Sequence, residues 1–170
     1  YELHPEYAYA ETCAALASLF WNWEMALISG DARYSDLFEW QLYNAAAVGM
    51  GLDGASYLYN NPLLCRGGVA RRPWYSVPCC PSNLSRTWAS LGKYLYSRDG
   101  HDLWIHQYVG SRADLGDGLR IEVESGLPWD GDVRLRLMRG TETLTEHVQP
   151  CRVAPLGEGR LTSAIAVPAA

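Results

Sequence analysis

The chain has 170 residues, enough for one ordinary domain or for parts of two, and 48% of them are hydrophobic, which is ample for a packed core. A formal net charge of −5 gives no electrostatic basis for binding nucleic acid or an anionic membrane surface. Seven tryptophans and eleven tyrosines suit a carbohydrate ligand, whose C–H faces stack on aromatic rings, although aromatic side chains also fill ordinary cores.

The first apolar-rich stretch, residues 8–28, is interrupted by Glu11, Asn22 and Glu24 and is amphipathic, so no transmembrane span is predicted. From Cys13 onward its apolar residues recur at steps of three and four, which predicts a helix ending near Ile28. The segment "SGDARY" then supplies a stop at Gly30 and a cap for a second helix, whose apolar stripe reaches Leu42 and extends as far as Val48.

The next segments are predicted to be mostly irregular. Residues 56–63, "SYLYNNPL", alternate and are rich in tyrosine, so they should be short and extended, and a polar loop follows over residues 65–73. A third helix is predicted over residues 81–96. Pro81 would be its first residue, where a missing N–H is tolerated.

The pattern changes beyond residue 100. "DLWIHQYVGS", "GLRIEVES" and "GDVRLRLMRG" alternate apolar and polar residues and are separated by turn sequences, which predicts antiparallel strands. Helices followed by strands without alternation indicate two domains, one over residues 1–100 and one beginning at residues 101–140. Residues 141–170 show no strand period and are predicted to form a tail of unclear structure.

Five cysteines stand at positions 13, 65, 79, 80 and 151, an odd number that fits a disulfide framework poorly. Adjacent cysteines rarely form a disulfide, because their Cα atoms are about 3.8 Å apart and disulfides prefer about 4.4–6.8 Å. Free thiols or metal-bound thiolates are therefore expected, which favours a reducing, cytoplasmic location. No function is assigned to Cys65 or Cys151.

Cys79 and Cys80 lie at the start of the third predicted helix, where the helix dipole stabilises a thiolate and lowers its pKa. A thiolate at this position could act as a nucleophile or as a metal ligand. The alternative is that the two thiols have no chemical role and fill a packed corner of the core. Glu11 and Cys13 reach one ion together only if the first helix begins at about residue 12. One carboxylate and three thiolates suit zinc. The alternative for Glu11 is to complement the helix dipole.

Several motifs occur in a fixed order along the chain: "YAETCAA", "LDGASYLYNNPL", "YSVPCCPSN" and "LGKYLYS". In this order and density the sequence, from Tyr1 to about Leu137, resembles glycoside hydrolase family 127, the β-L-arabinofuranosidases. The resemblance implies the closing helices of an (α/α)₆ barrel followed by the first strands of a β-sandwich. It also implies hydrolysis of β-L-arabinofuranosides with retention of configuration.

The family resemblance gives each thiol a role. It implies that zinc is held by Glu11, Cys13, Cys79 and Cys80, and that Cys79 is also the nucleophile, forming a thioglycosyl intermediate. An active-site tyrosine of the family corresponds to Tyr59, with Tyr57 as the competing assignment and a core-filling role as the alternative for either.

The same resemblance places the general acid/base glutamate before Tyr1, so the chain alone is expected to be inactive. The implied partners are an arabinose-containing oligosaccharide or glycoconjugate, the preceding barrel helices of a longer chain and a second copy in a homodimer. Two other functions stay open: a structural zinc-site protein or carbohydrate-binding module without catalysis, and a redox protein with vicinal thiols. The redox hypothesis leaves Glu11 and Cys13 without a role.

Overall fold

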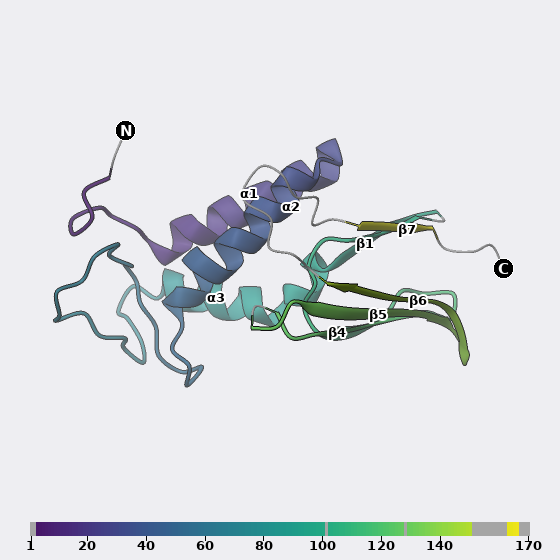
Figure 1. Ribbon diagram of the computed structural model, residues 1–170. Helices are drawn as coiled ribbons and strands as arrows, with labels where there is room; N and C mark the ends of the chain where they lie inside the picture. The colour runs from purple at the N-terminus through teal and green to yellow at the C-terminus, as the bar shows by residue number, and fades with distance from the viewer. Residues whose placement is uncertain (1–2, 101, 128, 151–162, 167–170) are drawn as a thin grey trace. The chain divides into compact units, whose positions relative to one another are not determined.

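A computed structural model describes residues 3–100, 102–127, 129–150 and 163–166. The chain forms two compact units, Tyr1–Lys93 and Tyr94–Ala170, and each is described by itself (Figure 1). None of the helices in the described ranges has the length and apolar character needed to cross a bilayer.

Helices dominate the first unit. α1 (Thr12–Ser29) and α2 (Ala32–Gln41) lie side by side (Figure 1). α1 ends at Gly30, whose left-handed φ of 64° suits a glycine, and the side chain of Asp31 caps α2 by accepting a hydrogen bond from the backbone N–H of Arg33. The periodicity and the capping residues thus predicted both helices correctly.

Two short helical turns continue α2: a π-helical turn, η1 (Leu42–Ala46), and a 3₁₀ turn, η2 (Ala47–Gly49). The stripe predicted as far as Val48 is therefore helical, but it changes its hydrogen-bonding pattern after Gln41. Side chains from α1, α2, η1 and the third helix form the buried interior of this unit: Leu16, Leu19, Phe38, Leu42, Ala46 and Leu84.

The third helix, α3 (Cys79–Ala89), differs from its predicted bounds at both ends. It begins at Cys79, so Pro81 is its third residue rather than its first. Proline is tolerated throughout the first turn, because none of those N–H groups has an intrahelical partner. The prediction that the helix reaches residue 96 is also wrong, since a 3₁₀ turn, η3 (Leu91–Tyr94), containing the poor helix former Gly92 leads into the first strand.

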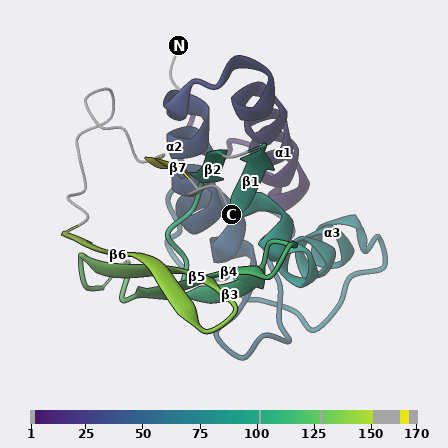
Figure 2. The same cartoon turned by 90° about the vertical axis from the view of Figure 1, so that its right-hand side faces the viewer.

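The second unit contains two antiparallel sheets. One has the order β1-β2-β7, from β1 (Tyr96–Asp99), β2 (Asp102–Ile105) and β7 (Ser163–Ala166). The other has the order β3-β4-β5-β6, from β3 (Ser111–Asp114), β4 (Leu119–Ser125), β5 (Asp132–Arg139) and β6 (Glu142–Pro150), which Figure 2 shows side by side. Residues of β2, β4 and β5 share one hydrophobic core: Leu103, Ile105, Leu119, Ile121, Val123, Val133, Leu135 and Leu137.

The three alternating segments contain strands as predicted. Two further strands lie after residue 140, in the stretch that was predicted as a tail of unclear structure. β6 pairs with β5 along its whole length, with a bulge at Leu137/Met138, and β7 pairs with β2. An edge strand receives its register from its partner, so it needs no strict alternation of its own. Cys151 and the rest of the predicted tail over residues 151–162 and 167–170 lie outside the described residues. The barrel and sandwich architectures remain predictions.

Candidate metal and catalytic centre

The chain enters α1 in an extended conformation, paired with a segment about fifty residues further on. The backbone N–H of Thr12 donates to the carbonyl of Tyr59 at 2.9 Å, and the N–H of Asn61 donates to the carbonyl of Ala10 at 2.8 Å. The side chain of Asn60 accepts from the N–H of Ala10 at 2.8 Å. These bonds fix the start of α1 against residues 58–61, which are extended as predicted.

Thr12 locks this pairing from inside the unit. Its side chain is fully buried, and its hydroxyl donates to the carbonyl of Leu58 at 2.8 Å and accepts from the side-chain amide of Asn61 at 2.9 Å. Gly49 packs directly on it, because a Cβ at that position would lie 2.9 Å from Thr12 Cγ2 and Oγ1. The position therefore requires a residue without a side chain.

Glu11 is the residue immediately before α1. Its backbone is extended, with φ −73° and ψ 137°, and its side chain makes no capping hydrogen bond. The condition under which Glu11 and Cys13 can reach one ion is therefore met, since α1 begins at Thr12 and leaves Glu11 on the entering chain. Because the carboxylate does not cap α1, it is directed to other partners.

Those partners are the three predicted thiols. One ligand atom from each of Glu11, Cys13, Cys79 and Cys80 lies within 4.8 Å of all the others. Glu11 Oε1 is 3.6 Å from Cys80 Sγ and 3.9 Å from Cys79 Sγ, and the two vicinal sulfurs are 3.9 Å apart. The starts of α1 and α3 thus converge on one point, and the group could hold a metal ion.

The two vicinal thiols have opposite electrostatic environments. Cys79 is half-buried, and the hydrogen bond between its sulfur and the Tyr59 hydroxyl, 3.3 Å apart, lowers the pKa of its thiol. The same bond raises the pKa of Tyr59, which therefore keeps its proton. Cys80 is fully buried, and desolvation raises the pKa of its thiol. Without a metal, Cys79 is the thiol that ionises more readily, so it is the better placed nucleophile.

The structure distinguishes the two candidate tyrosines. Tyr59 contacts the thiol of Cys79, whereas Tyr57 is buried with its hydroxyl 3.1 Å from Ser85 Oγ. The backbone of Tyr57 is paired with Arg72 through two hydrogen bonds of 2.8 and 2.9 Å. Tyr57 therefore has the structural role that was the alternative for either residue, and Tyr59 lies at the cluster.

Three further residues surround the cluster and were not singled out from the sequence. Tyr75 accepts a hydrogen bond from the N–H of Tyr59 at 3.3 Å, and its own hydroxyl donates to the carbonyl of Tyr57 at 3.1 Å. Tyr9 is hydrogen-bonded to Glu11 and Tyr59. The bond to Glu11 is the main cause that raises the pKa of the Tyr9 phenol. Asn83 donates from its side-chain amide to Cys13 Sγ at 3.2 Å.

The sequence holds a signal for two of these residues. Asn83 follows Cys79 by four positions, which places the two on the same face of a helix. Tyr9 is two positions from Glu11, and alternate residues of an extended chain share a side. Tyr75 lies in an irregular loop, where no periodicity could have indicated its position.

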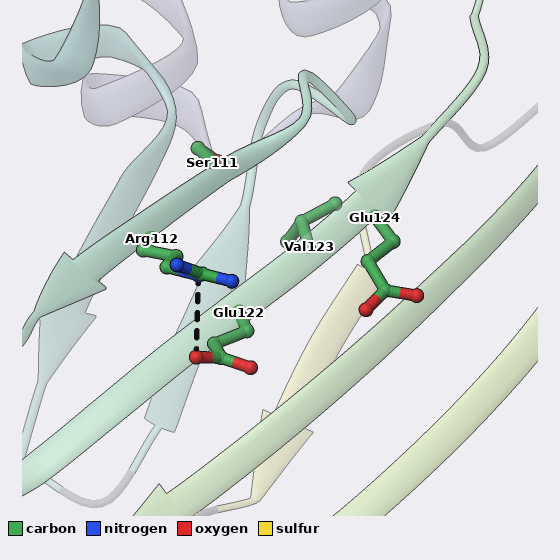
Figure 3. Close-up of a pocket in the computed structure, with 5 residues that line it drawn as sticks. All are labelled: Ser111, Arg112, Glu122, Val123 and Glu124. Atoms are coloured by element: carbon green, nitrogen blue, oxygen red, sulfur yellow. Dashed lines mark ion pairs between the residues drawn. The ribbon is translucent and has the colours of Figure 1, made fainter.

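Two other features lie outside the cluster. Cys65 is exposed, and its sulfur bonds only locally, 3.3 Å from the N–H of Gly67. An open hollow in the second unit lies along β3 and β4 and is lined by charged side chains, with Arg112 paired to Glu122 at 3.3 Å (Figure 3). The Ser111 hydroxyl in this hollow is hydrogen-bonded to Tyr96 and to the carbonyl of Val109, and Glu122 and Glu124 are paired with arginines, so we assign the hollow no chemistry.

Comparison with known proteins supports the family resemblance. The sequence model described as "Beta-L-arabinofuranosidase, GH127 catalytic domain" matches residues 1–93, more than half of the chain and the whole of the helical unit. The chain belongs to glycoside hydrolase family 127. Its GH127 segment carries all four residues of the cluster.

Individual relatives agree. A non-reducing end β-L-arabinofuranosidase of Bifidobacterium longum subsp. longum is 33% identical over 146 residues, which is 78% of this chain. A solved GH127 β-arabinofuranosidase is 39% identical over 81% of the chain with a TM-score of 0.76. A GH127 β-L-arabinofuranosidase of Geobacillus stearothermophilus T6 is 41% identical over 80% of it with a TM-score of 0.70. The chain spans 22% of the length of the first two relatives and 24% of the third.

Proposed function

We propose that this chain is the part of a retaining, zinc-dependent β-L-arabinofuranosidase that supplies the nucleophile and the metal ligands. The observation that carries the proposal is the convergence of one carboxylate and three thiols within 4.8 Å of one another, with the Tyr59 hydroxyl 3.3 Å from Cys79 Sγ. Membership of the family and the β-L-arabinofuranosidase relatives support the substrate class.

The spacing of the ligand atoms fits zinc. Two thiolates bound to one tetrahedral zinc ion at about 2.3 Å are about 3.8 Å apart, and a carboxylate oxygen at about 2.0 Å lies about 3.5 Å from each of them. The observed separations are 3.9 Å between Cys79 and Cys80, 3.6 Å between Glu11 and Cys80 and 3.9 Å between Glu11 and Cys79, and all four ligand atoms lie within 4.8 Å of one another. Sulfur-rich four-ligand sets favour this metal. When bound, zinc would keep the ligand thiols deprotonated at neutral pH.

Cys79 is the proposed nucleophile. Its Sγ lone pair bonds to the anomeric carbon while the C–O bond to the leaving group breaks, and the leaving oxygen takes the proton of a general acid. Water then attacks the same carbon, the C–S bond breaks with its electrons returning to sulfur, and the now deprotonated acid takes the proton of the water. Two inversions give net retention. The Tyr59 hydroxyl holds the sulfur in place through its hydrogen bond.

Glu11 is the one carboxylate in the cluster, and we assign it to the metal. The general acid is therefore proposed to come from another part of the longer enzyme, as are the remaining groups that bind the sugar. The Tyr59 hydroxyl lies beside Cys79, and the Tyr9 hydroxyl is hydrogen-bonded to Glu11 and Tyr59; both are suited to contact sugar hydroxyls.

The stereochemistry of the product tests the mechanism. Hydrolysis of a β-L-arabinofuranoside by the full-length enzyme is followed by NMR, and β-L-arabinose is expected as the first product. Release of the α-anomer would exclude a covalent cysteine intermediate. An electrophilic arabinofuranose analogue should label Cys79, and labelling of Cys80 alone would reverse the assignment within the pair.

A structural metal site is the second candidate. It is favoured by the number of ligands, because four donors complete a tetrahedral set and leave no open position, as in structural zinc sites. A protein that holds one equivalent of zinc, resists labelling at Cys79 and hydrolyses no arabinofuranoside would have this function.

A further inference from the structure

The three sulfurs of the cluster differ in their hydrogen-bond partners. Cys79 faces the Tyr59 hydroxyl at 3.3 Å. Cys80 is fully buried beside Glu11, at 3.6 Å. Cys13 is partly buried and accepts a hydrogen bond from the side-chain amide of Asn83 at 3.2 Å. A shared metal therefore does not make the three thiolates equivalent.

Asn83 lies on α3 where its side-chain amide can donate a hydrogen bond to Cys13. It lies one turn after Cys79 on α3, so its side chain points toward the ligands at the start of the same helix. An amide nitrogen is a donor and an amide oxygen is not, so only the nitrogen can face an anionic sulfur favourably. The donor and acceptor are 70 residues apart in sequence, and α1 packs against α3 to bring them together.

A hydrogen bond to a thiolate has a defined chemical effect. It draws electron density from the sulfur and so stabilises the negative charge that a metal-bound sulfur carries. Partners of metal ligands also fix the orientation of the ligand and adjust metal affinity. A sulfur held in this way is suited to stay on the metal throughout a reaction.

We infer that Asn83 is a positioning residue that orients Cys13 and holds it on the metal as a permanent ligand. The inference rests on the proposed function, because it requires a metal on the cluster. It assigns the retention of one ligand to a residue outside the ligand set.

Two substitutions of Asn83 in the full-length enzyme test the inference. Asn83→Leu removes the donor, and Asn83→Asp keeps the shape but presents only acceptor oxygens to the sulfur. Thr87→Val is the matched control, since Thr87 lies one turn further along the same helix and, among the described residues, its hydroxyl bonds to the backbone carbonyl of Asn83, at 2.7 Å. Asn83→Asp decides the result if the leucine variant does not fold.

The first readout is spectroscopic. With cobalt(II) in place of zinc, both Asn83 variants should move a thiolate-to-cobalt charge-transfer band to lower energy, because an unprotected sulfur holds its electrons less tightly. Affinity for the metal, from competition with a chelator, should fall by about 10–100-fold. Thr87→Val should change neither quantity.

The second readout is the site of alkylation. Iodoacetamide should modify the exposed Cys65 in every protein and, within the cluster, Cys79 alone in the metal-loaded parent. In the Asn83 variants a Cys13 released from the metal should be modified as well, as mapped by peptide mass spectrometry. Parent-like bands, affinity and labelling in a folded Asn83 variant would overturn the inference and leave the proposed function intact. A parent protein that takes up neither cobalt nor zinc would overturn the proposed metal centre, and the inference with it.

Discussion

The interiors of the two units are built from different kinds of contact. In the strand unit, eight buried aliphatic side chains from β2, β4 and β5 form one core, and charged pairs such as Arg112–Glu122, at 3.3 Å, lie on the exposed face. In the helical unit, residues of the candidate site are themselves part of the buried interior: Thr12 and Cys80 have almost no exposed surface. Their partners come from the starts of α1 and α3 and from the extended segment around residue 59.

This difference predicts that replacements in the two units have different effects. A core side chain in the strand unit has many apolar neighbours and no reactive partner, so its replacement should change stability alone. In the helical unit the reactive sulfurs depend on hydrogen bonds between residues up to 70 positions apart in sequence. Replacements there should change metal binding and catalysis even where stability is retained. The predictions below test this separation.

The largest effect is expected from Cys79→Ser in the full-length enzyme. A serine hydroxyl stays protonated near neutral pH and is a weak nucleophile without a dedicated base, so kcat/KM should fall on the order of 10⁴-fold or more. Cys65→Ser is the matched control, because Cys65 is exposed and outside the cluster, and it should retain parent activity. Near-parent rates in Cys79→Ser would eliminate a cysteine nucleophile.

Removing the metal should destabilise the helical unit and leave the stability of the strand unit unchanged. A ligand present at a thousand times its Kd stabilises a fold by about 4 kcal/mol, so chelation should cost the helical unit roughly that amount. Hydrogen exchange measured by mass spectrometry should then rise in residues 10–13, 57–61 and 79–84. It should stay constant in β4 and β5. An equal increase in both units would show that the separation is wrong.

Ile121→Ala should have the converse effect. Ile121 is fully buried in the strand core, so its truncation should lower the free energy of unfolding of that unit by about 2–4 kcal/mol. Its exposed neighbour Arg120 offers the control, since Arg120→Ala should change stability by no more than about 0.5 kcal/mol. Zinc content should stay at one equivalent in both variants. A drop in zinc content in Ile121→Ala would link the core to the site.

Local sequence patterns predicted much of this fold. The three-and-four spacing and the Gly30-Asp31 junction predicted α1 and α2, and alternation predicted β4 and β5, because each element buries one regular face. The end of α3 and the existence of β6 were not predictable in this way. β6 follows its pairing with β5, and the pattern of one segment does not contain the register of another.

The candidate site, like the fold, was only partly predictable from local sequence patterns. Helix starts and the family resemblance brought Glu11, Cys13 and the vicinal pair together before the structure, since a helix start is marked locally. The family resemblance already favoured Tyr59 over Tyr57, although the alternating pattern could not separate them, because both lie on one side of the segment. The structure places the Tyr59 hydroxyl 3.3 Å from Cys79 Sγ. Tyr75 could not be predicted, since its contact with Tyr59 depends on the path of an irregular loop.

Tyr75→Phe should have a moderate effect confined to the site. The substitution keeps the ring packed 5.7 Å from that of Tyr59 but removes the hydroxyl that joins the Tyr59 N–H to the Tyr57 carbonyl. Loss of one such link costs about 1 kcal/mol, so kcat should fall about fivefold while zinc content stays unchanged. Tyr34→Phe is the control and should leave kcat at the parent value. Among the described residues, the Tyr34 hydroxyl accepts a hydrogen bond from Arg33 of the same helix. Equal rates in the two variants would remove Tyr75 from the site.

The smallest effect concerns the pH dependence of the strand unit. His106 is buried there, 2.7 Å from Ser97 Oγ, and burial lowers the pKa of its imidazole. The unfolded chain, with the ordinary value near 6.5, therefore binds a proton at a higher pH than the folded chain does. Stability should be full above about pH 6.5 and should decline as the pH falls from there toward the lowered folded pKa. His106→Gln keeps a polar partner for Ser97 and should remove this slope between pH 7 and 5, as measured by urea-dependent hydrogen exchange in β4 and β5. A slope that persists unchanged in His106→Gln would assign the acid sensitivity of the strand unit to its carboxylates instead.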